Sequence, residues 1–84
     1  MVYVYVLRSG RDDFLYTGCT RDLRSRLSLH NAGQVSSTRE RRPLELIYYE
    51  ACPNERDAFR REKYLKTAYG KRYIKSRCRN YFTG

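Results

Sequence analysis

The sequence predicts an α+β domain with a small three-stranded antiparallel sheet flanked by helices, in the order ββαβαα. Three short stretches are rich in β-forming residues and are bounded by turn residues. The segments between and after them carry apolar residues at helical spacing. With 84 residues and one small core, we expect residues 1–84 to form a single domain.

The first two strands are predicted to form a hairpin. Val2–Leu7 alternates between valines on one face and Tyr3, Tyr5 and Leu7 on the other, which is the signature of a strand. Residues 9–13 are turn formers, so the strand Phe14–Gly18 should return beside the first. We expect Tyr5 to face Tyr16 across this hairpin. Gly18 should leave open backbone space beside Tyr16, where a substrate can approach closely.

The first helix is predicted over Arg21–Asn31, with Thr20 as its N-cap. Gly33 follows this helix and can adopt the left-handed conformation that often ends one. A polar loop, residues Gln34–Arg42, comes next.

The second half of the chain holds one strand and two helices. The third strand is predicted over Leu44–Tyr49, which is rich in β-formers. Asn54 caps a long helix, Asn54–Tyr69, that is expected to end where Gly70 breaks it. A short basic helix over Lys71–Arg79 completes the order.

Three polar side chains are expected to lean toward the same edge of the core. Glu62 projects into the apolar stripe formed by residues such as Ala58 and Leu65. On the first helix, Arg26 and His30 project beside the apolar column. Burying an unpaired carboxylate in a core costs on the order of several kcal/mol of stability. Glu62 therefore needs a cation, a basic partner or a water-filled cleft. Small proteins tolerate such residues mainly at functional sites.

The charge pattern favours a nucleic-acid partner. The net charge is +9, and residues 63–84 contain seven basic residues and no acid, with aromatic residues interleaved. Basic side chains supply salt-dependent affinity for phosphates, and aromatics stack on exposed bases. A solvated face that only aids solubility is the simpler alternative, and an anionic membrane surface is a weaker one. The candidate phosphate contacts are Lys71, Arg72, Lys75 and Arg77.

The cysteines and the lack of long apolar runs predict a cytoplasmic protein with reduced thiols. Cys19, Cys52 and Cys78 are widely spaced and form no CxxC pair, so neither a disulfide framework nor a structural zinc site is expected. No segment resembles a signal peptide or a membrane span. A lowered thiol pKa at Cys19, paired with His30 as a nucleophile, is a minor alternative chemistry.

Taken in order along the chain, these residues resemble the motifs of the GIY-YIG endonuclease family, in particular its small stand-alone members. The resemblance runs from Val2 to Arg79. It is carried by Tyr3-Val4-Tyr5, Tyr16-Thr17-Gly18, Arg26, His30 and Glu62. The sequence departs from the family pattern in two places. Ser36, Ser37 and Thr38 stand where many relatives carry a further His or Tyr, and only Asn80 is a candidate for the family's late asparagine.

The resemblance implies a divalent-metal-dependent endonuclease that hydrolyses phosphodiester bonds in DNA, with RNA also possible, low sequence specificity and a role in DNA repair or recombination. Glu62 would hold Mg²⁺ or Mn²⁺, and Arg26 would bind phosphoryl oxygens. Tyr5 or Tyr16 would act as general base, with a phenol pKa lowered by the metal and Arg26. His30 would orient Tyr5 or the water, or shuttle a proton.

Two other functions remain open on the sequence alone: a non-catalytic nucleic-acid-binding module on the same scaffold, and a subunit that needs a protein partner for activity or specificity. Each site residue also has a structural interpretation. Tyr5 can be an ordinary sheet tyrosine, His30 can be held by a helix end, and Glu62 can form a salt bridge with Arg26.

Overall fold

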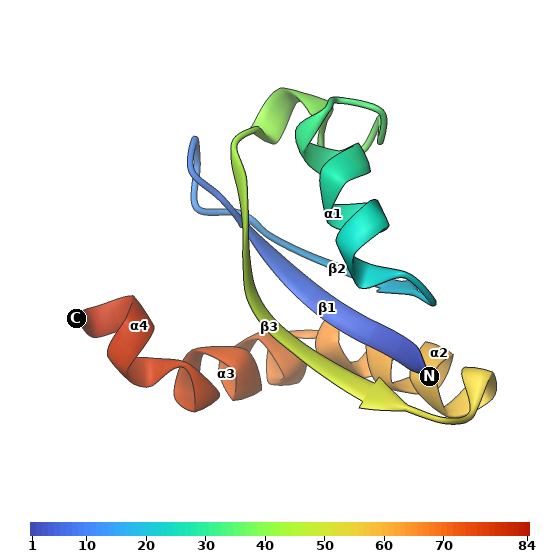
Figure 1. The fold of residues 1–84 in the computed structure, drawn as a ribbon. Helices are drawn as coiled ribbons and strands as arrows, with labels where there is room; N and C mark the ends of the chain where they lie inside the picture. The colour runs from blue at the N-terminus through green and yellow to red at the C-terminus, as the bar shows by residue number, and fades with distance from the viewer.

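A computed structural model describes residues 1–84 and has the predicted α+β architecture with a three-stranded antiparallel sheet. The strands are β1 (Val2–Ser9), β2 (Leu15–Thr20) and β3 (Leu44–Cys52). Their order in the sheet is β2-β1-β3, so β1 is central and the other two are edge strands (Figure 1). The third strand is three residues longer at its end than predicted, because Glu50–Cys52 continue the pairing with β1.

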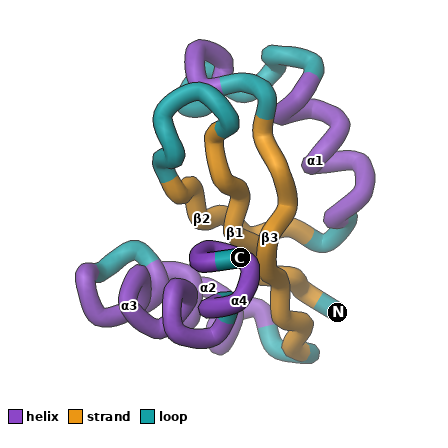
Figure 2. Tube along the Cα trace, turned by 90° about the vertical axis from the view of Figure 1, so that its left-hand side faces the viewer, coloured by secondary structure: helices purple, strands orange, loops and turns teal.

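The helices cover both faces of the sheet. Helix α1 (Leu23–Asn31) lies on one face, and α2 (Glu55–Leu65), α3 (Ala68–Arg77) and α4 (Arg79–Thr83) lie on the other (Figures 1 and 2). The predicted polar loop between α1 and β3 contains one turn of 3₁₀ helix, Arg39–Arg41. None of these helices is both long enough and apolar enough to cross a bilayer.

The alternation of β1 builds a separate core on each face of the sheet. Its valines pack toward the side of α2 and α3, in a fully buried cluster of Val2, Val4, Val6, Ala58, Leu65 and Ile74. On the α1 side, Tyr5 and Leu7 are buried with Leu44. The half-buried residues packed against this second cluster are Tyr16, Leu23, Leu27 and Leu46. The predicted facing of β1 is therefore confirmed.

The hairpin register differs from the prediction by two residues. Tyr5 is opposite Gly18, and Tyr16 is opposite Leu7, so the two tyrosines are diagonal neighbours on one face. Their ring centroids are 6.4 Å apart. Diagonal pairs remain within reach of aromatic side chains, so the predicted proximity holds although the direct pairing is wrong.

Helix α1 begins two residues later than predicted. Asp22, not Thr20, is the N-cap: its carboxylate accepts a hydrogen bond from the backbone N–H of Ser25 at 3.1 Å. Thr20 instead accepts from the backbone N–H of Asp22 at 3.1 Å, which makes it part of the turn before the helix. Gly33 has a φ of 79° just past the helix end, as predicted.

The predicted break at Gly70 is wrong. Helix α2 ends at Leu65, and Thr67 caps α3 by accepting from the backbone N–H of Gly70 at 3.1 Å. Gly70 is buried inside α3, where an added Cβ would lie 2.3 Å from both the Leu65 Cα and the Tyr64 carbonyl oxygen. The glycine serves a close approach between the two helices rather than a helix end.

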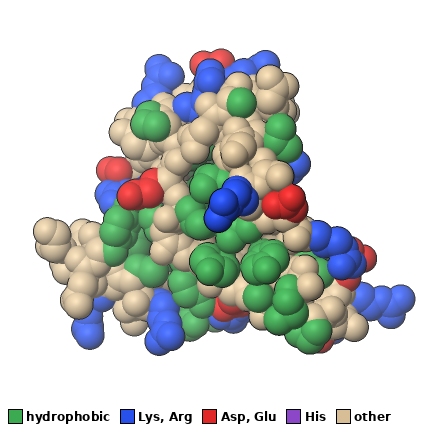
Figure 3. Space-filling model, in the orientation of Figure 1, with side chains coloured by type: hydrophobic (Ala, Val, Ile, Leu, Met, Phe, Trp, Pro, Cys, Tyr) green, Lys and Arg blue, Asp and Glu red, His purple; other side chains and the backbone are tan.

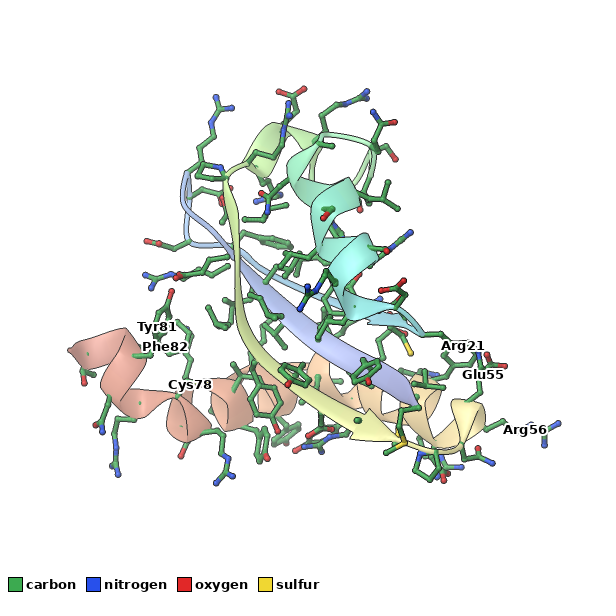
Figure 4. All side chains as sticks on the ribbon, viewed as in Figure 1. Arg21, Glu55, Arg56, Cys78, Tyr81 and Phe82 are labelled. Atoms are coloured by element: carbon green, nitrogen blue, oxygen red, sulfur yellow. The ribbon has the colours of Figure 1, made fainter.

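A further short helix, α4, follows the predicted ones and returns to the sheet. The Arg8 guanidinium lies 5.4 Å from the ring centroid of Tyr81 and 5.2 Å from that of Phe82. The Tyr81 hydroxyl also donates a hydrogen bond to Glu45. Figure 4 shows both aromatic side chains turned from α4 toward the sheet.

We expect Gly70→Ala to destabilise the protein by about 1–3 kcal/mol, because the new methyl group meets backbone atoms that cannot move aside independently. For a chain of this size, each kcal/mol lowers the Tm by about 4–8 °C. Thermal unfolding followed by circular dichroism measures the effect. Ser76→Ala, at an exposed position of the same helix, should leave the free energy of unfolding within about 0.5 kcal/mol of wild type. Equal Tm values for the two variants would contradict this role of Gly70.

Candidate active site

A chain of buried hydrogen bonds ties β1 to α1 and to the loop after it. The Tyr5 hydroxyl lies 2.9 Å from His30 Nε2, and His30 Nδ1 lies 2.8 Å from Thr38 Oγ1. Thr38 in turn donates to the Val35 carbonyl at 3.4 Å. Because the threonine proton is used there, the threonine oxygen accepts from Nδ1–H, and Nε2 accepts from the tyrosine hydroxyl. All three side chains are almost fully buried.

Tyr16 completes this cluster from β2. Its ring centroid lies 5.0 Å from that of His30, in an edge-to-face arrangement, while Tyr16 itself is only half-buried. The sequence predicted open space above Gly18, but this space is filled. A Cβ there would lie 2.4 Å from the Tyr5 hydroxyl oxygen, so the tyrosine ring occupies the room that the missing side chain leaves. Gly18 therefore admits Tyr5 to the site.

Arg26 lies beside both tyrosines and has no acidic partner. The pKa of Arg26 is held above its ordinary value, mainly by its contact with the Tyr5 side chain and to a lesser extent by Tyr16. Its buried Nε atom has no hydrogen-bond partner, and it forms no salt bridge. The alternative pairing of Arg26 with Glu62 is therefore wrong. An arginine held in this way keeps its planar donors available for an anion.

The pKa values of the cluster are governed first by burial. Burial raises the pKa of Tyr5, and the opposing effect of Arg26 does not offset it. Arg26 thus acts on the pKa of Tyr5 in the predicted direction, but burial raises that pKa by more. Burial also lowers the pKa of His30, and the charge of Arg26 lowers it further. At neutral pH the imidazole is uncharged, which agrees with its acceptor role toward Tyr5.

Glu62 lies on α2, which packs against the opposite face of the sheet (Figure 1). Its side chain is 21% exposed, and Lys66 Nζ lies 3.0 Å from its Oε2. No hydrogen bond joins it to Tyr5, Tyr16 or Arg26, yet its charge contributes to raising the pKa of Tyr5. This charge effect is the smallest of the contributions to the Tyr5 pKa, and no contact joins the carboxylate to the tyrosine cluster.

The side chains around Glu62 fit a hard divalent cation better than a zinc ion. No group of three or more His, Cys, Asp or Glu side chains comes together anywhere in the protein. A lone carboxylate cannot form a closed zinc site. It does suit Mg²⁺, which keeps several waters and takes its remaining ligands from substrate phosphates.

The alternative nucleophile at Cys19 is wrong. Cys19 pairs with Val4 and lies on the α2 face of β2, whereas His30 packs on the other face. Burial raises the pKa of the Cys19 thiol, and the charge of Glu62 raises it further. A thiol with a raised pKa is mostly protonated at neutral pH and is a poor nucleophile.

The four predicted phosphate contacts divide into two pairs on α3. Lys71 and Lys75 line hollows beside β2, and Lys71 borders the same hollow as Tyr16. Arg72 instead lies over the ring of Tyr69, 4.7 Å from its centroid. Arg77 borders a separate hollow near the start of α4. Of the four, only Lys71 borders a hollow that a residue of the candidate site also lines.

Two residues of the site were missed from the sequence. Thr38 was noted only as a departure from a family motif, and nothing in its polar loop predicts burial against His30. Lys66 is four residues after Glu62, a spacing that does predict an ion pair on a helix. Asn80, the candidate for the family's late asparagine, is exposed on α4 and makes no hydrogen bond with the cluster.

Comparisons with known proteins agree with this arrangement. Residues 1–77 match the family described as GIY-YIG catalytic domain. A UPF0213 protein of Clostridium perfringens is 45% identical over 79% of this chain and 71% of its own length. For one from Bacillus pumilus the values are 46%, 77% and 66%, and for one from Staphylococcus haemolyticus 41%, 77% and 79%. The names of these relatives state no reaction. No solved structure matches the chain at comparable significance.

We expect stability to fall with acidification in a way that depends on His30, the one histidine of the chain. Its pKa is lower in the folded state, so the unfolded chain takes up the proton first as pH falls below about 6.5. This contribution is fully present above that pH and is lost toward the folded pKa, at no more than about 1.4 kcal/mol per pH unit. Urea unfolding between neutral pH and about pH 5 should show the loss.

The matched variant for this prediction is His30→Gln, which cannot titrate. It should be less stable than wild type at neutral pH, yet show a shallower decline with acid over the same range. Equal slopes for the two proteins would mean that His30 does not titrate on unfolding.

Proposed function

This chain belongs to the GIY-YIG catalytic domain family, and we propose that it is a divalent-metal-dependent endonuclease that hydrolyses phosphodiester bonds in DNA. The observation that carries the proposal is the Arg26 guanidinium, which is held beside two tyrosines with no carboxylate to neutralise it. A cation kept free in this way is suited to the charge that develops on phosphoryl oxygens during cleavage.

Arg26 would bind the non-bridging oxygens of the scissile phosphate. Its planar fork matches phosphate geometry, and its position between the tyrosines limits the orientations that it can adopt. The Nε atom is buried, so the guanidinium would bind phosphate through its terminal amino groups.

Tyr16 is the better candidate for the residue that accepts a proton from the attacking water. It is half-buried and borders a hollow at the β2 edge, whereas Tyr5 is 1% exposed and donates its proton to His30. Burial also raises the pKa of Tyr5. Tyr5, His30 and Thr38 would then be positioning residues, which hold the Tyr16 ring and Arg26 in place.

Glu62 would hold the metal ion, and nucleases of this family generally depend on a divalent cation. When bound, Mg²⁺ or Mn²⁺ would stabilise charge on the phosphate and on the departing oxygen. Lys66 is the present partner of the carboxylate and would have to release it. Because this ion pair is partly exposed, separating it costs little.

The remaining features of the proposed function are its sequence specificity, its binding to the phosphate backbone, its location and its partners. No groove-reading element is evident beyond the catalytic fold, so intrinsic sequence specificity should be low. The net charge of +9 would supply binding to the phosphate backbone. A cytoplasmic location, a role in DNA repair or recombination and a protein partner that adds specificity complete the proposal.

A non-catalytic nucleic-acid-binding module is the second candidate. The Glu62–Lys66 ion pair favours it, because a carboxylate neutralised by lysine has a reduced affinity for cations. Magnesium-dependent nicking of plasmid, single-stranded and branched DNA by the purified protein separates the two functions. Cleavage seen in cell extract but not with purified protein would indicate a subunit that needs a partner.

We expect Glu62→Ala to abolish magnesium-dependent cleavage while DNA binding is retained, because the variant loses the proposed metal ligand but no part of the basic surface. Cleavage is measured by plasmid nicking, and binding by fluorescence anisotropy without metal. Glu55→Ala is the matched control on the same helix, where Glu55 pairs at the surface with Arg21 (Figure 4). Undiminished cleavage by a carefully purified Glu62→Ala protein would refute the metal role.

We expect Tyr16→Phe to lower the cleavage rate by about 10²- to 10⁴-fold, the usual contribution of a general base. Substrate affinity should change little, because only one hydroxyl group is removed. Tyr69→Phe, at a tyrosine that is 67% exposed on α3, is the control and should cleave like wild type. A Tyr16→Phe protein with wild-type rate would exclude this phenol as the base.

A further inference from the structure

A groove runs along the β2 edge away from the candidate active site. It consists of two hollows, of about 220 and 330 Å³, that share Phe14, Leu15 and Lys71. The first hollow also borders Tyr16, and the second extends to Phe82 of α4. Figure 2 shows α3 below β2 at this edge of the sheet, on the side away from α1.

The walls of the groove carry an excess of positive charge. Lys66, Lys71 and Lys75 line it from the helical side, and Arg8 lines its far end. The only acid lining either hollow is Asp13, and Arg8 pairs with it at 3.0 Å. Lys71 and Lys75 form no salt bridge with any carboxylate. These two lysines are therefore free for an anionic ligand.

An exposed aromatic ring stands in the middle of the groove. Phe14 is 38% exposed, and the Arg41 guanidinium lies over its ring at 3.8 Å from the centroid. The Lys71 ammonium is 5.9 Å from the same centroid. Because Arg41 already covers one face of the ring, a base would stack on the other face, as bases do on the aromatic rings of single-strand-binding grooves.

The spacings along the two walls agree with each other. Phe14 and Tyr16 are two residues apart near β2, which corresponds to about 6–7 Å along a strand. Lys71 and Lys75 are one helical turn apart, which corresponds to about 6 Å along α3. Aromatic and cationic groups therefore advance together from the site toward α4. Figure 3 shows another side of the molecule, where most Lys and Arg side chains lie around the rim and one lies near the centre.

We propose that this groove holds an unpaired nucleic-acid strand adjoining the cleaved phosphate, with Phe14 stacked on a base and Lys71 and Lys75 on phosphates. The inference rests on the proposed function and narrows its substrate class to nucleic acids with a single-stranded segment. Inside a duplex the bases are stacked on one another, so only an unpaired base can offer its face to Phe14. DNA and RNA share the stacking and phosphate chemistry.

Binding without metal tests the stacking role separately from catalysis. Fluorescence anisotropy in EDTA is measured with single-stranded DNA, the same sequence as RNA, and a blunt duplex. Phe14→Leu should weaken binding of the single strand by about 5- to 150-fold and leave duplex binding unchanged. Phe14→Tyr, which keeps a stacking ring, should bind like wild type. An equal loss on single strand and duplex, or no loss on either, would overturn the proposal.

The lysines have a matched control pair on the same helix. Lys71→Ala/Lys75→Ala should reduce the slope of log affinity against log salt for the single strand by about 1.4, at about 0.7 for each lost phosphate contact. Arg72→Ala/Arg77→Ala removes the same charge outside the groove and should leave the slope unchanged. Equal slopes for the two double variants would show that the strand does not follow β2.

The groove and the proposed nuclease activity fail in different ways. A protein that does not cleave with Mg²⁺, but loses single-strand affinity selectively in Phe14→Leu, retains the groove and refutes the nuclease. Suppose instead that the protein cleaves, but that Phe14→Leu and Lys71→Ala/Lys75→Ala change its affinities for single strand and duplex equally. The nuclease proposal then stands and the groove proposal is refuted. A selective loss on RNA but not on DNA would assign the groove to RNA.

Discussion

The hydrogen bond between the Tyr5 hydroxyl and His30 Nε2 is the contact on which the candidate site depends. The bond is buried under α1, so water cannot take the place of either partner if the other is lost. Thr38 fixes the proton on the far side of the imidazole, so the ring has a defined tautomer and orientation. Because Tyr5 is held in this way, Arg26 and Tyr16 are packed against a rigid partner. The same bond joins β1 to α1 and therefore serves the fold as well.

The proposed site would combine residues from both faces of the sheet around its β2 edge. The tyrosines and Arg26 come from the α1 face, and Glu62 comes from α2 on the other face. Side chains from opposite faces can approach each other only around an edge strand, and β2 is such a strand. An edge also leaves room for a substrate, which the buried middle of the sheet does not. In this structure the Glu62 carboxylate forms an ion pair with Lys66.

Much of the fold and of the site was predictable, because strong periodicity and short motifs encode both. The alternation of β1 fixed which face each tyrosine occupies, and the helical spacing placed His30 toward the core. Effects that depend on tertiary packing were not predictable. The roles of Gly70 and Thr38 arise from neighbours distant in space, and the raised pKa of Tyr5 arises because burial outweighs the nearby cation. The helix start at Asp22 was missed because Thr20 and Asp22, two residues apart, are both of a type that caps helices.

The contact of Gly70 with the end of α2 has a consequence for how such a small protein can change. The absent side chain lets α3 cross at backbone distance, and this crossing sets how far Lys71 stands from the rim of the sheet. The lack of a side chain at Gly70 thus determines how closely Lys71 approaches β2. The stability of the protein and the position of Lys71 therefore both depend on Gly70, so a substitution there would change the two together.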